Sequence, residues 1–199
     1  MVKVAVVYYS STGINYQLAN WAKEAVKDAG ADVRLVRAPE NAPEEAVASN
    51  EAWKAHIEAT KDISEVTSDD FEWADGIIFS IPTRFGTLPS QMKSVIDSQG
   101  GLWASGKTVN KVVTAMTSAS NPNGGQEATL LNLYTAMMHW GAIIVPPGYS
   151  DQSVFGAGGN PYGTSVTQGQ DGKMVEEVEE AVKHQAKRLV EITQKVAGK

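Results

Sequence analysis

The chain has 199 residues, of which 42% are hydrophobic and 20% charged, and it contains no cysteine. This composition is typical of a globular protein with a substantial core, and it excludes disulfides, thiolate metal sites and cysteine nucleophiles. A total of 17 basic and 23 acidic residues gives a net charge of −6 without any basic cluster, so we expect no nucleic-acid partner. No apolar run approaches the ~20 residues of a membrane span, so we expect no integral membrane contact. A strand pattern that begins at once leaves no room for a signal peptide, and we expect a cytoplasmic protein with a single domain over residues 1–199.

The N-terminal segment combines a strand, a polar turn and a helix. An apolar run over residues 2–7 predicts the strand, and apolar residues at helical spacing follow the turn Tyr8-Tyr9-Ser10-Ser11-Thr12-Gly13-Ile14-Asn15. Such a turn forms an anion site, because backbone N–H groups and the positive end of the helix face one point. Three hydroxyls and one glycine suit a phosphate monoester. An ordinary turn that uses Ser and Thr as helix caps would have the same composition.

The rest of the chain alternates short apolar runs with helical patterns. Strands are predicted over residues 32–37, 76–81, 111–116 and 142–145. Helices are predicted after the first turn, from about residue 90, through 130–138 and at the C-terminus. Residues 100–110 indicate a glycine-rich loop, and the polar segments near 39–70 and 149–172 indicate insertions. Five strands alternating with helices imply parallel pairing and right-handed crossovers. The predicted fold class is α/β, a three-layer α/β/α sandwich with a five-stranded parallel sheet.

One segment matches the Walker A phosphate-binding pattern letter for letter: Gly101-Leu102-Trp103-Ala104-Ser105-Gly106-Lys107-Thr108. That pattern works when a strand precedes it and a helix follows, so that the helix start faces the phosphates. Here a predicted helix precedes the match and a predicted strand follows it. We therefore interpret the match as coincidental; Mg-dependent ATP binding that is lost in Lys107→Ala would contradict this interpretation.

A different set of loops is expected to meet in space. In a doubly wound sheet of order 2-1-3-4-5, ligands bind at the carboxyl ends of the strands, where the winding reverses between strands 1 and 3. The loops expected there are residues 10–15, 82–86 and 117–125, all rich in Ser, Thr, Asn or Gly and free of Asp and Glu. Three neutral, donor-rich loops suit a flat, phosphorylated ligand. Flavin mononucleotide (FMN) fits, with its phosphate in the first loop and its ring between the other two.

Five segments carry a family resemblance. They are Val6-Val7-Tyr8-Tyr9-Ser10, Pro82-Thr83-Arg84-Phe85-Gly86, Gly100-Gly101-Leu102-Trp103-Ala104-Ser105-Gly106, Gly124-Gly125-Gln126-Glu127 and Val145-Pro146-Pro147-Gly148-Tyr149. In this order the chain resembles the WrbA-type NAD(P)H:quinone oxidoreductases of the flavodoxin-like superfamily. The resemblance spans most of the chain, which makes it specific. It implies FMN as cofactor, NADH or NADPH as electron donor, two-electron ping-pong reduction of a quinone, and a homotetramer whose active sites borrow residues from neighbouring subunits.

The resemblance also implies roles for individual residues, and the flavin itself carries the chemistry, so no catalytic side chain is expected. The implied cofactor-binding residues are Ser10, Ser11, Thr12, Gly13, Ile14, Asn15, Pro82, Thr83, Arg84, Phe85, Thr117, Ser118, Ala119, Ser120, Asn121, Asn123, Gly124 and His139. Trp103, as an aromatic wall, and Thr12 are implied in substrate binding. The chain departs from the family at Thr12, where well-known relatives have Tyr on the nicotinamide side, and at Asn121-Pro122-Asn123, where they have glycines and threonines.

Several of these residues have simpler explanations when taken alone. Arg84 would be a surface ion-pair partner, but in its neutral loop we assign it to the pyrimidine edge of the flavin, where reduction places negative charge. His139 near a helix end would interact with the helix dipole. His56, His139 and His184 lack metal-ligand spacing, so we expect no protein-bound metal. Three further tryptophans are assigned to packing: Trp53, Trp73 and Trp140.

Two alternative functions stay open. A flavodoxin-type electron carrier commonly surrounds its flavin with acidic residues, whereas the loops here are neutral with one arginine. A flavin-binding regulatory or interaction protein would be indicated by a basic face or a recognition helix, and the sequence contains neither. The natural quinone and the preference between NADH and NADPH are not specified by any motif.

Overall fold

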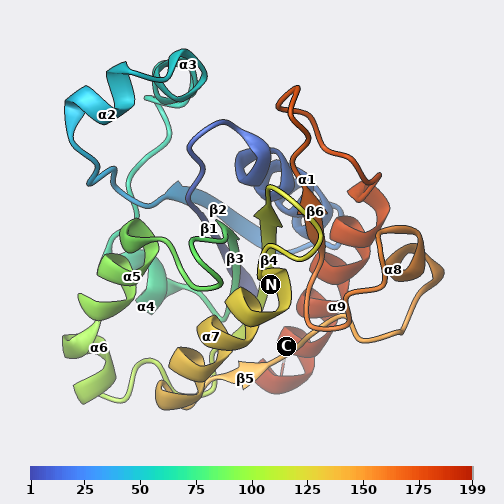
Figure 1. Ribbon diagram of the computed structural model, residues 1–199. Helices are drawn as coiled ribbons and strands as arrows, with labels where there is room; N and C mark the ends of the chain where they lie inside the picture. Colours follow the sequence, from blue (N-terminus) through green and yellow to red (C-terminus); the bar gives the residue numbers. More distant parts are fainter. Residues whose placement is uncertain (199) are drawn as a thin grey trace.

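Apolar runs rich in Val and Ile form a parallel sheet of order β2-β1-β3-β4-β5, which helices cover on both faces (Figure 1). The computed structural model describes residues 1–198. Its strands are β1 (Lys3–Tyr8), β2 (Asp32–Arg37), β3 (Gly76–Pro82), β4 (Val112–Ala119), β5 (Ile143–Ile144) and β6 (Ser165–Thr167). Its helices are α1 (Ile14–Asp28), α2 (Glu44–Ala48), α3 (Glu51–Ala59), α4 (Ser68–Trp73), α5 (Ser90–Asp97), α6 (Gly100–Ala104), α7 (Gln126–His139), α8 (Gln152–Gly156) and α9 (Glu179–Ala197).

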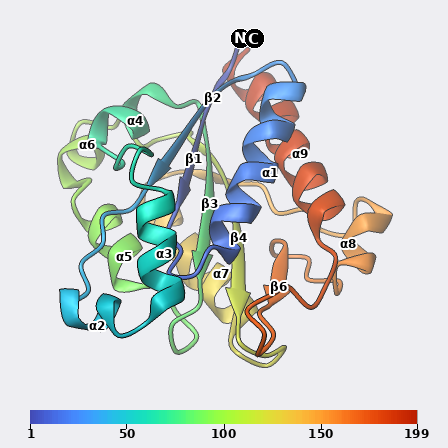
Figure 2. The same ribbon diagram turned by 90° about the horizontal axis from the view of Figure 1, so that it is seen from above.

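Alternate side chains of each central strand enter two separate cores. Val4 and Val6 of β1 pack beneath α1 and α9, whereas Ala5 and Val7 face the core that α5 and α7 cover. Figure 2 shows α1 and α9 on one side of the sheet and α4 and α5 on the other. Because successive side chains of a strand point to opposite faces, buried strands of this kind require a helical layer on each side. The predicted three-layer sandwich and its strand order are confirmed.

The second insertion contributes a sixth strand that was not predicted. Residues 149–172 contain α8 and β6, and β6 pairs in parallel with the carboxyl end of β4, with Thr117 opposite Ser165 and Ala119 opposite Thr167. This pairing extends β4 to Ala119, beyond the predicted end at residue 116. The first three residues of the predicted loop 117–125 are therefore strand. The sequence of β6 has two hydroxyl residues among three and contains no apolar run, so the pattern that predicted the other strands is missing there.

Other boundaries also differ from the prediction. Residues 39–70, predicted to be polar with weak helical patches, contain α2 and α3 and the start of α4, and residues 100–110 begin with α6 instead of a loop. The last of the five strands, β5, has two residues instead of four. The Walker A match overlaps α6 and precedes β4, and its Lys107 forms an ion pair with Glu72, with Nζ 2.5 Å from Oε1. The order of elements is therefore the reverse of a P-loop.

A buried glutamine of α9 connects the second insertion to the sheet. Gln185 is 1% exposed, and its Nε2 donates to Thr114 Oγ1 at 2.7 Å and to the Ala115 carbonyl at 2.8 Å. Its Oε1 accepts from the N–H and the hydroxyl of Thr164, both at 2.8 Å. The neighbouring Gly163 lies so close to β4 that a Cβ would come within 2.1 Å of the Ala115 carbonyl oxygen. Only glycine permits this approach.

We predict that Gln185→Leu lowers the free energy of unfolding by about 2–3 kcal/mol, because several buried donors and acceptors lose their partner. Chemical denaturation measures this change. Gln17→Leu, on the exposed side of α1, is the matched control and should change the free energy by less than about 0.5 kcal/mol. Equal stability of Gln185→Leu and the unaltered chain would contradict the connecting role.

Candidate active site

A cavity of about 240 Å³ opens at the carboxyl edge of the sheet, beside the turn between β1 and α1. All three predicted loops and both insertions contribute to it. Its lining residues are Ser10, Ser11, Thr12, Ile14, Asn15, Asn50, Trp53, Pro82, Arg84, Ser118 and Gln168. Asn50, Trp53 and Gln168 do not belong to the predicted set, whereas the other lining residues do. The structure thus gathers the first loop with parts of the second and third.

The turn holds three hydroxyl groups against N–H donors. The N–H of Gly13 (φ 101°) donates to Ser10 Oγ at 2.9 Å. Arg84 Nη2 donates to Ser11 Oγ at 2.7 Å, and the Thr12 hydroxyl oxygen accepts an amide N–H from the second insertion at 3.0 Å. Helix α1 begins directly after the turn, so its first unpaired N–H groups lie beside these hydroxyls. The turn therefore presents several donors at the positive end of a helix.

The side chain of Asn15 forms hydrogen bonds to the sheet and is 1% exposed. Its Nδ2 donates to Ser80 Oγ at 3.3 Å, and its Oδ1 accepts from Ser118 Oγ at 2.6 Å. Ser80 in turn donates to the Asn15 carbonyl at 2.8 Å. Two side chains predicted to contact FMN, Asn15 and Ser118, are thus bonded to each other. This contact fixes the first turn of α1 against β3 and β4.

The loop after β3 is a tight hairpin. Arg84 and Thr87 exchange both backbone hydrogen bonds, at 2.9 and 3.0 Å. Between them, Phe85 (φ 52°) and Gly86 (φ 78°) are both left-handed, as in a type I′ turn. The Phe85 side chain is fully exposed. The Arg84 guanidinium folds back to Ser11, so it bridges the second loop to the turn between β1 and α1.

The second and third loops touch at two glycines. A Cβ on Gly125 (φ 91°) would lie 2.6 Å from the Cα of Gly86. The adjacent Thr83 hydroxyl oxygen accepts from Thr129 Oγ1 at 2.6 Å. These contacts hold the second and third loops together, and Pro82, Arg84 and Ser118 are the residues by which the two loops line the cavity.

Most residues predicted from the third loop lie outside the cavity lining. Asn123 lines a separate cavity of about 680 Å³ between the start of α7 and the second insertion. Thr117 is fully buried in β4. The predicted residues that are not part of the 240 Å³ lining are Gly13, Thr83, Phe85, Thr117, Ala119, Ser120, Asn121, Asn123, Gly124, Trp103 and His139.

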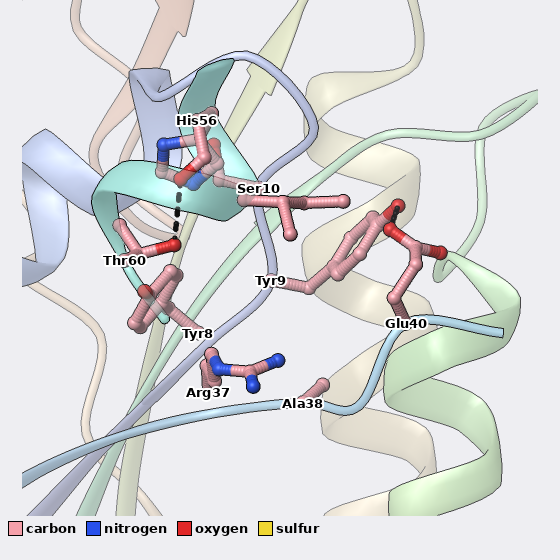
Figure 3. A pocket seen from close by; sticks show the side chains of 9 residues that line it. Tyr8, Tyr9, Ser10, Arg37, Ala38, Glu40, His56 and Thr60 are labelled. Carbon is pink, nitrogen blue, oxygen red and sulfur yellow. Dashed lines mark hydrogen bonds between the residues drawn. The ribbon is translucent and has the colours of Figure 1, made fainter. Parts of the chain in front are cut away.

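Helix α3 of the first insertion covers the turn from the β2 side. Figure 3 shows His56 of this helix near Ser10, with Thr60 close to Tyr8. A Cβ on Gly13 would lie 3.7 Å from His56 Nδ1, so the helix packs directly on the turn. Burial lowers the pKa of His56. The lowered pKa favours the neutral ring at neutral pH, so His56 adds no positive charge beside the turn.

Glu40 anchors this insertion. Its Oε2 accepts from Tyr9 Oη at 2.9 Å and from Trp53 Nε1 at 3.0 Å, and its Oε1 accepts from Gln91 Nε2 at 2.6 Å and from the Ala42 N–H at 3.0 Å. Partial burial raises the pKa of Glu40, but the hydrogen bonds outweigh it and hold the pKa below its usual value. Trp53, assigned to packing from the sequence, is instead anchored through its indole N–H and lines the cavity.

Trp103 and His139 lie together near the amino ends of the parallel strands, opposite the carboxyl ends where the cavity opens. Trp103 Nε1 donates to the His139 carbonyl at 3.0 Å, and both side chains are exposed. Just after α7, Ile143 pairs with Val112, the first residue of β4, whereas Ser118 lies at the other end of that strand. An eight-residue strand is roughly 25 Å long. Within one chain, Trp103 and His139 therefore do not reach the cavity.

Two further observations concern residues 1–198. No three His, Asp or Glu side chains in this range lie close enough together to hold a metal ion. None of its helices is both long and apolar enough to cross a membrane.

Comparison with known proteins places the chain in a family. Residues 2–153 match the family described as NADPH-dependent FMN reductase. The chain belongs to this family. A protein of Deinococcus radiodurans named NAD(P)H dehydrogenase (quinone) is 54% identical over 198 residues, which cover 99% of this chain and 98% of that protein. A protein of the same name from Chelativorans sp. is 39% identical, with coverage of 98% and 99%.

Solved structures agree with this family's fold. The crystal structure of a flavodoxin, WrbA-like protein from Agrobacterium tumefaciens has a TM-score of 0.68 at 22% identity, and the match covers 98% of this chain and 99% of that one. A flavodoxin from the domain Archaea has a TM-score of 0.60 at 15% identity, with the same coverage. The predicted fold class and the resemblance to WrbA-type quinone oxidoreductases are confirmed.

We predict that Glu40→Gln lowers the free energy of unfolding at pH 7, because an amide NH₂ would replace an oxygen that accepts two hydrogen bonds. The folded pKa of Glu40 lies below its unfolded value, so its stabilisation is present above the ordinary carboxyl pKa and is lost as the pH falls through the folded value. The difference between the variant and the unaltered chain should therefore shrink as the pH falls below the ordinary carboxyl pKa.

Urea denaturation at several pH values measures this difference. Glu45→Gln, at an exposed position of α2, is the control and should show a small effect at every pH. A Glu40→Gln effect that does not change with pH would contradict the role of the ionised carboxylate.

Proposed function

We propose that the chain binds FMN in the 240 Å³ cavity and acts as an NAD(P)H:quinone oxidoreductase. Its family, described as NADPH-dependent FMN reductase, supports this proposal, as does the 54% identical relative named NAD(P)H dehydrogenase (quinone). The observation that carries it for this chain is the cavity itself, where three hydroxyls and a helix start meet a single arginine. Because NADH and NADPH are intracellular metabolites, the proposal includes a cytoplasmic location.

The residues present fit a phosphate group. Ser10, Ser11 and Thr12 supply hydroxyls, and the first N–H groups of α1 supply backbone donors. In the part of the chain that the structure describes, the lining contains one cation, Arg84, and no carboxylate, so no lining side chain repels an anion. Ser118 borders the remaining space, where a neutral ring would lie. The proposed FMN-binding residues are Asn50, Trp53 and Gln168 together with the predicted ones that line the cavity: Ser10, Ser11, Thr12, Ile14, Asn15, Pro82, Arg84 and Ser118. For the predicted residues outside this lining, a role in FMN binding stays a prediction.

When bound, FMN supplies the redox chemistry, a hydride from NAD(P)H being taken up and two electrons being passed to a quinone. The residues of the chain bind, orient and adjust charge. Arg84 supplies the positive charge of the lining, and a nearby positive charge favours the uptake of two electrons. Next to it, the exposed Phe85 ring offers an apolar surface on which a flat substrate can stack. One cavity serving both substrates requires that they occupy it in succession.

We further propose a homotetramer in which Trp103 and His139 of one subunit complete the cavity of another. Both side chains are exposed at the edge of the sheet away from the cavity of their own chain. Exposed apolar side chains accompany them on α7 and beside α6, namely Val109, Leu131 and Met138. Burying such side chains between subunits would favour assembly.

We predict that the purified chain binds FMN at micromolar concentration, that NAD(P)H then bleaches the flavin absorbance, and that a quinone restores it. Initial rates at several quinone concentrations should give parallel double-reciprocal plots, because both substrates use one cavity in turn. Intersecting plots would contradict successive occupation. Strong accumulation of one-electron-reduced protein on photoreduction would favour an electron carrier instead. Absence of FMN binding would refute the proposed function.

Mixed oligomers test the proposed sharing of active sites. Trp103→Ala and Ser10→Glu should each be nearly inactive alone, because one removes the pocket wall and the other places a carboxylate beside the phosphate. Co-expression combines an intact turn of one subunit with an intact Trp103 of another, so part of the activity should return. The control is a chain that carries both substitutions. If verified mixed oligomers recover no activity, the sites are not shared.

A further inference from the structure

Gln168, which belongs to the second insertion, contacts the turn between β1 and α1, although the two are 156 positions apart in the sequence. Its Nε2 donates to Thr12 Oγ1 at 3.0 Å, and both residues line the cavity. A threonine hydroxyl has one proton, and because its oxygen already accepts this N–H, the proton is left to donate. Among residues 1–198, the hydrogen bonds include no protein acceptor for that proton. The Thr12 O–H is therefore available to a ligand in the cavity.

Gln168 is held in place by the sheet. It directly follows β6, which pairs with the end of β4, and its backbone N–H donates to the Ala119 carbonyl at 2.7 Å. The Nε2 group also lies 3.4 Å from the Gly172 carbonyl, which fixes the rotation of the amide. The adjacent Thr167 N–H donates to Glu176 Oε2 at 2.6 Å. The amide is thus oriented before any ligand arrives, and little ordering would accompany binding.

The oxygens of the other two hydroxyls of the turn also accept N–H groups. Ser10 Oγ accepts the Gly13 N–H, and Ser11 Oγ accepts from Arg84. The Ser11 hydroxyl itself donates to Tyr9 Oη at 3.5 Å, a long hydrogen bond. Each of the three oxygens thus accepts an N–H, and the hydrogen bonds among residues 1–198 include no protein acceptor for the hydroxyl protons of Ser10 and Thr12. Such a cluster suits a ligand group that has only acceptors, and an ionised phosphate is such a group.

We propose that Gln168 is a positioning residue for the phosphate group of the ligand, acting by orienting the Thr12 hydroxyl as a donor. This inference rests on the proposed function, because it assumes that FMN binds at this turn. A phosphate monoester has its second pKa at about 6 and is mainly a dianion at neutral pH. The oriented hydroxyl therefore strengthens the binding of the phosphate and does not affect the ring.

FMN and riboflavin, which lacks the phosphate, separate this role from a general effect on the loop. Quenching of flavin fluorescence measures the Kd of each flavin for the purified chain. Gln168→Ala should weaken FMN binding about tenfold, as expected for one lost hydrogen bond to a charged group, and should leave riboflavin binding unchanged. Gln170→Ala, at an exposed position two residues further along the same loop, is the matched control and should bind both flavins normally.

A double-mutant cycle with Thr12→Val tests whether Gln168 acts through Thr12. In that background, Gln168→Ala should change the Kd for FMN by less than about twofold, because no hydroxyl is left to orient. Additive losses would overturn the proposal, since Gln168 would then contact the ligand independently. Unchanged FMN binding in Gln168→Ala, or equal losses for FMN and riboflavin, would also overturn it. If the unaltered chain binds no FMN, the proposed function fails as well, so the two failures are distinguishable.

Discussion

The side chain of Asn15 uses both of its polar atoms inside the protein. One bonds to Ser80 of β3 and the other to Ser118 of β4. Because the amide is buried, the loss of either hydrogen-bond partner would destabilise the protein by about 1–3 kcal/mol. The start of α1 is therefore fixed to two strands at the point where the winding of the sheet reverses. The position of the turn, the direction of its N–H groups and the floor of the cavity all depend on this contact.

Strong local periodicity made much of the fold predictable. Buried apolar runs identified the five strands, and their alternation with helices implied the order that places residues 10–15 beside residues 82–86. Local signals fail where pairing partners are distant in sequence. The three residues of β6 form a strand because they pair with the carboxyl end of β4. They are too few to show the alternation of apolar and polar residues that predicts a strand. Gln168 owes its position to that pairing, so no local pattern could have identified it.

Charge and composition predicted the character of the site better than the role of each residue. The neutral loops with one arginine do line one cavity, but Arg84 bonds to the turn and Asn15 to the sheet. Trp53 appeared to be a packing residue because its anchor, Glu40, lies 13 positions earlier in a segment without periodicity. Trp103 and His139 entered through resemblance alone. Within a single chain they lie near the amino ends of the strands, away from the cavity, so the fold of one chain does not connect them to it.

Gly163 provides a way to compare this chain with its relatives. A side chain at this position would collide with the Ala115 carbonyl, so glycine is a condition for the second insertion to lie against β4. A related sequence with any larger residue there must hold the insertion further from the sheet. In such a relative, a glutamine aligned with Gln168 would no longer stand beside the turn. The residue at position 163 therefore indicates, from sequence alone, which family members build this side of the cavity from the same insertion.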